Sequence, residues 1–180
     1  MKFKETNLKD CFIVEPDIFK DIRGSFHETF NQKKYEDGLQ RKLEFVQDNC
    51  SVSSKHVLRG MHFQNKNPQG KLVMVTFGKV LDVAVDLRKN SNTYGNWYSV
   101  ILSDLNKKQL WLPEGFAHGF LVLSEFAHFS YKCTTFYDPI DEVCLKWNDK
   151  DISINWACKN PIISNKDSEG LSFRDIKNIT

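Results

Sequence analysis

One histidine stands inside a short strand-like segment, together with an arginine and a glycine. Residues 57–64 read VLRGMHFQ, and His62 is the residue among them best suited to acid–base chemistry. The unperturbed pKa of a histidine lies close to neutrality, so a pocket can tune the ring into a proton acceptor with a small change of environment. We therefore take His62 as the candidate base.

Strand alternation divides this segment into two faces. One face is expected to hold Leu58, Gly60, His62 and Gln64, and the other Arg59, Met61 and Phe63. A glycine inside a strand often marks a β-bulge, which re-aims the neighbouring side chains. A bulge at Gly60 is therefore expected to turn Arg59 toward the side of His62.

A metal centre is the first alternative to a proton relay, because first-row metals bind to closely placed His, Cys or carboxylate groups. The residue two after His62, which would point the same way, is Gln64 rather than a second histidine. The other histidines show no i, i+2 pairing either: His27, His56, His118 and His128. The sequence therefore predicts no bound metal.

Anion binding is the second chemistry that the sequence suggests. The chain contains neither GxxxxGK[ST] nor GxGxxG, so nothing predicts a glycine-rich phosphate cradle. Four cations lie in loop or glycine-punctuated settings, where they would suit a diphosphate held by side chains. They are Arg23, Arg59, Lys71 and Lys166.

Composition narrows the class of protein. The 180 residues are 41% hydrophobic and carry a net charge of +2, which supports a single packed domain and supplies no strong field for nucleic acid or a membrane. The five cysteines form no CxxC pair, and residues 1–10 (MKFKETNLKD) lack the apolar core of a secretory signal. We expect reduced, mostly packed cysteines and a cytoplasmic protein.

Strand signals dominate the middle of the chain. Strands are predicted at 72–77, 80–87, 97–102 and 126–136, two more within 110–123 around a tight loop, and two short ones within 8–30. One short helix is predicted at 31–38, with Asn31 as its N-cap and Gly38 as its stop, and the chain after Trp147 reads as polar loop. This spacing is typical of an all-β sandwich or barrel.

Two of these strands show which faces should be apolar. In 80–87 one face carries Leu81, Val83, Val85 and Leu87, whereas Asp82 and Asp86 lie on the other and would meet water or a polar pocket. In 126–136 the apolar face carries Ala127, Phe129, Tyr131 and Cys133. Tyr131 should thus bring its hydroxyl group into the interior.

Five segments resemble the dTDP-4-dehydrorhamnose 3,5-epimerase family, in the order and at the spacing of that family. They are DIRGSFHETF; QDNCSVSS with VLRGMHFQ; QGKLVMV with DVAVDLR; WLPEGFAHGFLVLSE; and the pair Lys166 and Asp167. The similarity runs from about Cys11 to Asp167. It implies a cupin-type jelly-roll β-barrel with short flanking helices, with an N-terminal segment of about 1–45 that contributes to a homodimer, a barrel of about 46–150, and a C-terminal loop and helix region of 151–180.

The resemblance also implies roles for individual residues. The family's base falls on His62, its orienting carboxylate on Asp167 and its acid on Tyr131. Lys71 matches a residue that stabilises negative charge on the sugar's C4 oxygen. The expected substrate-binding residues are Arg23, Phe26, Glu28, Gln47, Asn49, Arg59, His118, Tyr137 and Lys166, of which the first three reach toward the neighbouring subunit's nucleotide.

The family reaction needs no redox cofactor, because the hydrogens on carbons 3 and 5 of a 4-keto sugar are both acidified by the carbonyl. The sequence departs from the usual family pattern at His27, Met74 and His56. These departures leave open an enzyme that inverts one carbon only, or that acts on another nucleotide-linked 4-keto-6-deoxy sugar or a heptose. A metal-dependent cupin and a non-catalytic sugar-binding cupin are further alternatives.

Overall fold

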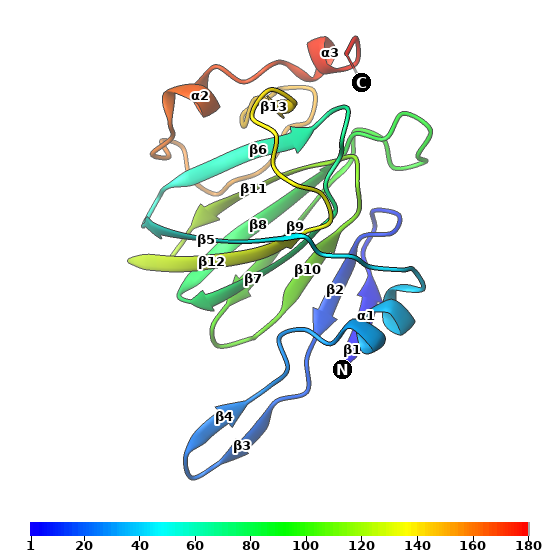
Figure 1. Cartoon of the computed structure of the whole chain (residues 1–180). Coiled ribbons are helices and arrows are strands. Elements are labelled where there is room, and N and C mark those ends of the chain that lie inside the picture. Colours follow the sequence, from blue (N-terminus) through cyan, green and yellow to red (C-terminus); the bar gives the residue numbers. More distant parts are fainter. Residues whose placement is uncertain (180) are drawn as a thin grey trace.

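Two antiparallel β-sheets lie face to face and form most of the molecule (Figure 1). The computed structural model describes residues 1–179. The first sheet has the order β1 (Lys2–Glu5), β2 (Phe12–Glu15), β10 (Gln109–Leu112), β7 (Lys71–Phe77), β12 (Phe126–Cys133), β5 (Gln47–Ser54). The second has the order β13 (Glu142–Cys144), β6 (Leu58–Gln64), β11 (Phe116–Val122), β8 (Lys79–Asp86), β9 (Trp97–Ser103). The predicted all-β jelly-roll architecture is thereby confirmed.

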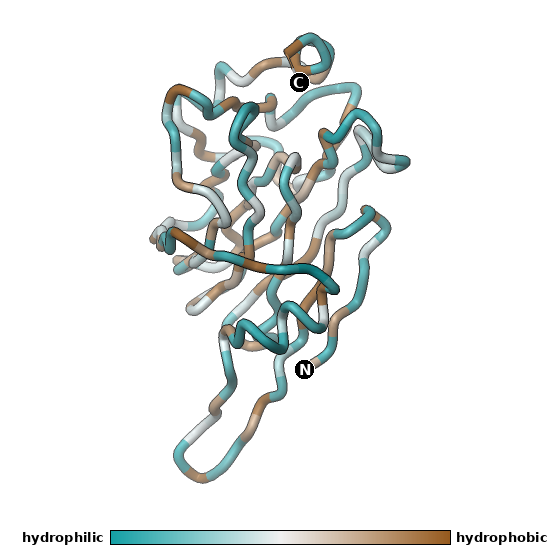
Figure 2. The backbone as a smooth tube through the Cα atoms, turned by 45° about the vertical axis from the view of Figure 1, so that its right-hand side comes forward, coloured by the Kyte–Doolittle hydropathy of each residue, from teal (hydrophilic) through white to brown (hydrophobic). Residues whose placement is uncertain are grey.

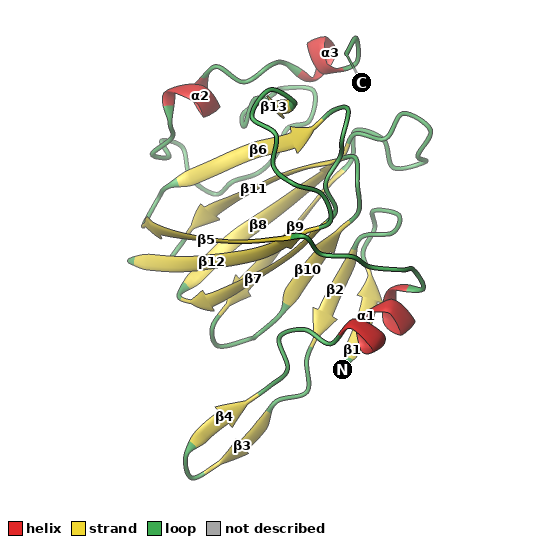
Figure 3. Cartoon of the chain, in the orientation of Figure 1, coloured by secondary structure: helices red, strands yellow, loops and turns green. Residues whose placement is uncertain are grey.

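Helices are few and lie at the margins of the sheets (Figure 3). They are α1 (Gln32–Leu39), α2 (Asn165–Ser168) and α3 (Phe173–Ile176). None of the helices among residues 1–179 has the length and apolar character needed to cross a bilayer. The short flanking helices expected from the family resemblance are present.

The barrel interior is filled from both sheets. Val73 and Val75 of β7 and Phe129 of β12 meet Val80 of β8 and Phe120 of β11 in one buried cluster. Because side chains alternate along each strand, the opposite face of the second sheet must find separate cover. The C-terminal region supplies that cover and anchors the chain above β6 and β13 (Figure 3).

This second core has its own aromatic and aliphatic residues. Trp156, Phe173 and Ile176 from the C-terminal region pack with Val83 and Val85 of β8. The predicted apolar face of β8 is thus confirmed. The polar face of β8 is buried as well, since neither Asp82 nor Asp86 has any exposed surface.

Strand β6 contains the expected irregularity, which overturns the simple alternation predicted for it. His62 pairs with His118 of β11 while Arg59 pairs with Phe120, so three residue steps on β6 oppose two on β11. The extra residue reverses the faces, and Leu58, Met61 and Phe63 all pack in the second core. A Cβ on Gly60 would lie 2.6 Å from the Cα of Gly119, so the two strands approach closely only because Gly60 has no side chain.

The N-terminal third differs from the sequence prediction in detail. Asn31 caps α1 as predicted, accepting a hydrogen bond from the backbone N–H of Lys34. Gly38 does not end the helix; Gln40 does, in the left-handed conformation with φ 53°. Gly38 is needed instead because the ring of Phe3 occupies the space of a side chain there. Residues 8–30 hold three strands rather than two, and β1 precedes them unpredicted.

The last two of these strands form a hairpin that projects from the barrel. β3 (Phe19–Asp21) and β4 (Gly24–Phe26) pair only with each other (Figure 1). Large apolar side chains on this arm are open to solvent: Phe19 is 63% exposed, Phe26 67% and Ile22 fully exposed. Figure 2 shows apolar positions along the same arm. Such exposure far from the core is typical of a surface that another chain covers.

Candidate active site

The candidate base meets its predicted carboxylate across two distant parts of the chain. His62 on β6 and Asp167 on α2 are joined by a contact of 2.7 Å between Nε2 and Oδ1. The other carboxylate oxygen of Asp167 accepts a hydrogen bond of 3.1 Å from the backbone N–H of Gly60. Ser164, the N-cap of α2, accepts from the backbone N–H of Asp167 and so fixes that residue in the first turn.

The electrostatics of Asp167 suit an orienting role. Burial alone would raise the pKa of its carboxyl group, but hydrogen bonds from His62, from Gly60 and from Ser164 hold that pKa below its usual range. Asp167 is therefore ionised at neutral pH. As an ionised carboxylate it accepts the Nε2–H of His62 and leaves Nδ1 as the proton-accepting nitrogen of the ring.

His62 opens into a cavity of about 270 Å³ between the sheets. The predicted site residues in its wall come from five strands: Asn49 of β5, Arg59 and His62 of β6, Lys71 of β7, His118 of β11, and Tyr131 of β12. Because Arg59 lines this cavity, the bulge in β6 does bring Arg59 and His62 to the same side. Arg59 also donates from Nε to the hydroxyl group of Ser53 over 2.9 Å.

Lys71 and Tyr131 have environments that shift their pKa values in useful directions. Burial lowers the pKa of the Lys71 ammonium group, partly offset by Cys133 and Asp82 nearby. Among residues 1–179, no hydrogen bond or ion pair occupies that ammonium group. Burial raises the pKa of the Tyr131 phenol, which keeps it protonated and able to donate.

A second hollow, of about 290 Å³, continues the first. It shares Asn49, His62, Lys71 and Tyr131 with the first cavity, and so the two form one cleft. Its remaining wall consists of Gln47, Gln69, Tyr137 and Glu142. Lys166 approaches this end through an ion pair with Glu142. The predicted residues Gln47, Tyr137 and Lys166 are thus gathered here.

Three predicted residues lie elsewhere. Arg23 and Phe26 belong to the projecting hairpin, where Arg23 pairs with Asp21 at 2.5 Å. Glu28 follows the hairpin and pairs with Lys34. None of these three lines either hollow of the cleft.

Sequence reasoning missed two acidic residues of the site. Asp82 of β8 lies 2.9 Å from Nε2 of His118 through Oδ2, while its buried Oδ1 has no partner among the described residues. An aspartate between apolar strand residues was a signal for such a site, and the prediction went only as far as a polar pocket. Glu142, by contrast, follows a turn and gave no signal of its place in the cleft.

One group of three possible metal ligands also lies here among residues 1–179. The ligand atoms of His62, Cys144 and Asp167 are all within 4.8 Å of one another.

Comparison with known proteins agrees with this geometry. The family model described as dTDP-4-dehydrorhamnose 3,5-epimerase matches residues 5–175. The enzyme of that name from Shigella flexneri is 52% identical over 176 residues, which cover 97% of both chains.

Solved structures show the same relationship. A dTDP-4-dehydrorhamnose 3,5-epimerase from Elizabethkingia anophelis superimposes with a TM-score of 0.93 at 51% identity and 97% coverage of both chains. A dTDP-6-deoxy-D-glucose-3,5-epimerase from Legionella pneumophila, in complex with dTDP-4-keto-L-rhamnose, gives 0.93 at 45% identity and covers 99% of this chain and 94% of that one. The chain therefore belongs to the dTDP-4-dehydrorhamnose 3,5-epimerase family of isomerases, as its motifs indicated.

Proposed function

We propose that this protein inverts carbons 3 and 5 of dTDP-4-keto-6-deoxy-D-glucose to give dTDP-4-keto-L-rhamnose, without a cofactor. The observation that supports this most is the 2.7 Å contact between His62 and Asp167 at the wall of a cavity that Lys71 and Tyr131 also line. This set contains a base, an orienting carboxylate, a cation and an acid. Those are the groups that proton removal and return beside a carbonyl require.

His62 removes the proton. Loss of a hydrogen from carbon 3 or carbon 5 produces an enolate, and its charge resides on the C4 oxygen. Asp167 holds the imidazole in the tautomer whose Nδ1 accepts the proton, and it stabilises the imidazolium that results. Because the pKa of Asp167 is held low, the carboxylate does not take the proton itself.

Lys71 stabilises the enolate. Its ammonium group has no protein partner among the described residues and its pKa is lowered by burial, so a developing negative charge is its best available counterion. A preorganised cation of this kind acts strongly in a site that excludes water. His118, held by Asp82, offers its ring to the sugar from the neighbouring strand.

Tyr131 returns a proton from the opposite face of the ring. Burial raises the pKa of its phenol, so it carries the proton it must donate at neutral pH. Inversion needs donor and acceptor on opposite sides of the carbon, and His62 and Tyr131 come from different sheets that face each other across the cavity.

The remaining site residues bind the nucleotide diphosphate. Arg59 and Lys166 contact the diphosphate, while Gln47 and Asn49 provide polar contacts at the nucleotide sugar, and Tyr137 stacks on the base. Tyr137 is positioned by its backbone N–H, which donates to Gln47 over 2.8 Å. Aromatic stacking of this kind contributes about 1–3 kcal/mol per base.

A second copy of the chain completes each site. The hairpin carrying Arg23 and Phe26 exposes apolar side chains, as an arm that packs on a partner would. We place Arg23, Phe26 and Glu28 at the partner's nucleotide within a two-fold homodimer of one-domain subunits. Sedimentation of wild type and Phe26→Ser tests this: a fully active wild-type monomer contradicts it. A cytoplasmic location is part of the same proposal, to be checked by cell fractionation.

The decisive experiment follows hydrogen exchange into the substrate. NMR of the wild-type reaction in deuterated water should show deuterium at both carbon 3 and carbon 5. Deuterium at one carbon alone would instead identify a single-carbon epimerase. Deuterium at neither carbon would contradict the proposed reaction, and loss of activity with a chelator would point to a metal-dependent cupin.

Tyr131→Phe separates the two halves of the mechanism. Wash-in of deuterium should continue at one carbon because His62 remains, while full inversion fails because the donor is lost. Tyr98→Phe is the matched control, since Tyr98 is a partly buried tyrosine packed against the barrel core outside the cleft. Equal loss in both variants would contradict the role of Tyr131.

A further inference from the structure

Cys144 lies beside the His62–Asp167 pair and has no part in the proposed reaction. Strand β13 pairs with β6 so that Cys144 stands directly opposite His62. Directly opposite residues of an antiparallel pair point to the same face. The sulfur of Cys144 therefore lies on the side where His62 meets Asp167, and the three ligand atoms are within 4.8 Å of one another.

These three side chains form a ligand set of the kind that zinc prefers. Thiolate, imidazole and carboxylate bind Zn²⁺ at about 2.0–2.3 Å, which places neighbouring ligand atoms about 3–4 Å apart around one ion. The pair at 2.7 Å needs to open slightly, and the sulfur needs to approach it. Both movements are small.

The surroundings already orient the carboxylate for such an ion. The backbone N–H of Gly60 holds Oδ2 of Asp167, which leaves Oδ1 directed at His62. Hydrogen bonds that orient a ligand in this way strengthen metal sites. The side chain of His62 is 27% exposed and borders the cavity, so an ion can reach the pair and hold a water molecule as its fourth ligand.

We propose that His62, Asp167 and Cys144 form an inhibitory site for a thiophilic divalent metal ion, Zn²⁺ or Cd²⁺. The ion takes Nε2 of His62, Oδ1 of Asp167 and the sulfur of Cys144. The proton on Nε2 moves to Nδ1, and the thiol proton of Cys144 goes to solvent. With Nδ1 protonated, the ring cannot accept a proton from the sugar.

The ion in this site acts as an inhibitor and has no role in catalysis. In the free protein the thiol of Cys144 donates to the carbonyl oxygen of Leu145 and leaves the His62–Asp167 pair undisturbed. Mg²⁺ and other ions that favour oxygen ligands gain little from a thiol and should not bind here. The inhibitory effect rests on the proposed role of His62, whereas metal binding does not.

The test is a titration of the full-length chain with Cd²⁺, followed by ultraviolet absorption of the Cd–thiolate bond. One equivalent should produce the absorption and should inhibit deuterium exchange, and excess EDTA should reverse both. In Cys144→Ala and Cys144→Ser, exchange without metal should match wild type, while the Cd²⁺ concentration for half-inhibition should rise at least about tenfold. Mg²⁺ should have no effect.

Cys11→Ala is the matched control, because Cys11, like Cys144, is buried and has a thiol pKa raised by burial to about 12, but lies in the barrel core and lines neither hollow of the cleft. It should bind Cd²⁺ like wild type. Unchanged inhibition or unchanged Cd–thiolate absorption in both Cys144 variants would overturn the proposal. Failure of the proposed function looks different: Cd²⁺ would still bind through Cys144, but His62→Asn would still exchange.

Discussion

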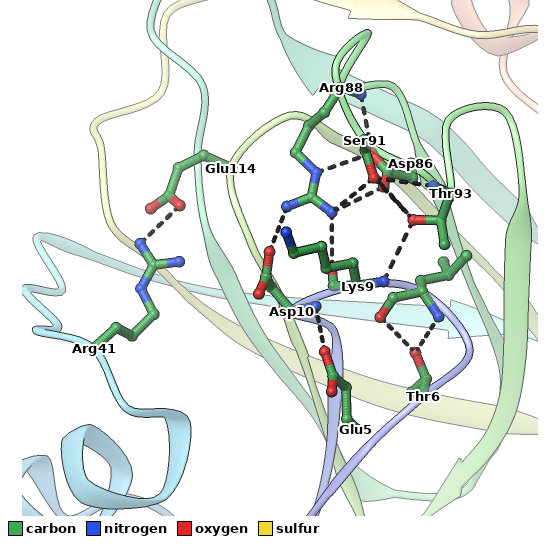
Figure 4. A network of polar contacts seen from close by, with 11 residues as sticks. Glu5, Thr6, Lys9, Asp10, Arg41, Asp86, Arg88, Ser91, Thr93 and Glu114 are labelled. Atoms are coloured by element: carbon green, nitrogen blue, oxygen red, sulfur yellow. Dashed lines mark hydrogen bonds and ion pairs between the residues drawn. The ribbon is translucent and has the colours of Figure 1, made fainter.

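Two aspartates on one strand, Asp82 and Asp86, differ in how completely their carboxylates are hydrogen-bonded. Both belong to β8, lie on the same face and have no exposed surface. Asp86 is fully engaged: Oδ1 accepts from the backbone N–H and the Nε of Arg88, and Oδ2 accepts from Arg88, Ser91 and Thr93 (Figure 4). Asp82 has one partner, His118, and one oxygen without any among the described residues.

The difference separates a structural cluster from a functional one. Arg88 extends the Asp86 network to Asp10 and to the carbonyl group of Lys9, and so ties the loop after β1 to the end of β8 (Figure 4). Burying a charge is costly unless its hydrogen bonds are satisfied. At Asp86 they are satisfied by the protein. At Asp82 and Lys71 they are incomplete, and Lys71 lines the cavity, where a ligand can complete its hydrogen bonds.

The largest effect should come from the functional side, in His62→Asn. Exchange of both sugar hydrogens should fall by about 10²- to 10⁴-fold, the usual contribution of a positioned general base, because the asparagine cannot accept the proton. Stability should fall less than in Asp86→Asn, because Asp167 keeps its hydrogen bond from the backbone N–H of Gly60. Exchange measured by NMR is the readout, and a fall below tenfold would remove His62 from the mechanism.

Asp86→Asn should show the reverse pattern. It leaves the Arg88 guanidinium without its main partner, and breaking a buried pair typically costs about 3–5 kcal/mol. Urea unfolding should report that loss, while the folded fraction keeps its rate of exchange. If Asp86→Asn instead lost activity without losing stability, the division into structural and functional clusters would be wrong.

Lys71→Met should lower activity and raise stability at once. Loss of a charge-stabilising group typically costs about 10²- to 10³-fold in rate. The lowered pKa of Lys71 means that the folded protein disfavours the charged form, so the free energy of unfolding should rise at neutral pH by about 1 kcal/mol. Parallel kinetic and urea measurements check both signs. A less stable Lys71→Met would show that the ammonium group is well satisfied.

Asp82→Asn should lower the free energy of unfolding by about 1 kcal/mol or less, which is a smaller loss than for Asp86→Asn, because one oxygen of Asp82 makes no hydrogen bond in the folded protein. The effect should appear in the kinetics, as His118 loses the carboxylate that orients it. An equal loss in the free energy of unfolding for the two variants would show that Asp82 is as important to stability as Asp86.

The smallest expected effect concerns acid stability at Asp167. Its folded pKa lies below the ordinary value of 3.8, so its contribution to stability is complete above that value and is lost as the pH falls through the folded pKa. Wild type should therefore lose stability more steeply below about pH 4 than Asp167→Asn does. Unfolding curves at several acidic pH values measure this. The same pH dependence of the free energy of unfolding in both proteins would contradict a stabilising role of the Asp167 carboxylate.

Much of this molecule could be predicted from local pattern. Period-two alternation, together with turn residues at regular spacing, indicated most strands of both sheets, though not β1 or β13, and Asn31 indicated the start of α1. The family motifs contain His62 and Lys71, and the resemblance assigned the acid to Tyr131, because side-chain chemistry and strand position are properties of short segments. The bulge in β6 was predicted from Gly60, since a glycine inside a strand often marks a bulge.

The tertiary structure decided which side chains contact one another. Asp82 and Asp86 occupy equivalent positions in the pattern of β8. Asp86 takes its donors from Arg88, Ser91 and Thr93 in the loop that follows, whereas Asp82 gains His118 only because β11 packs beside β8. The bulge reversed the faces of β6, and the ring of Phe3 made Gly38 a packing residue rather than a helix stop. Cys144 meets His62 only through the pairing of β13 with β6. Such contacts join residues far apart in the chain, and their geometry depends on how whole sheets pack, which no local pattern contains.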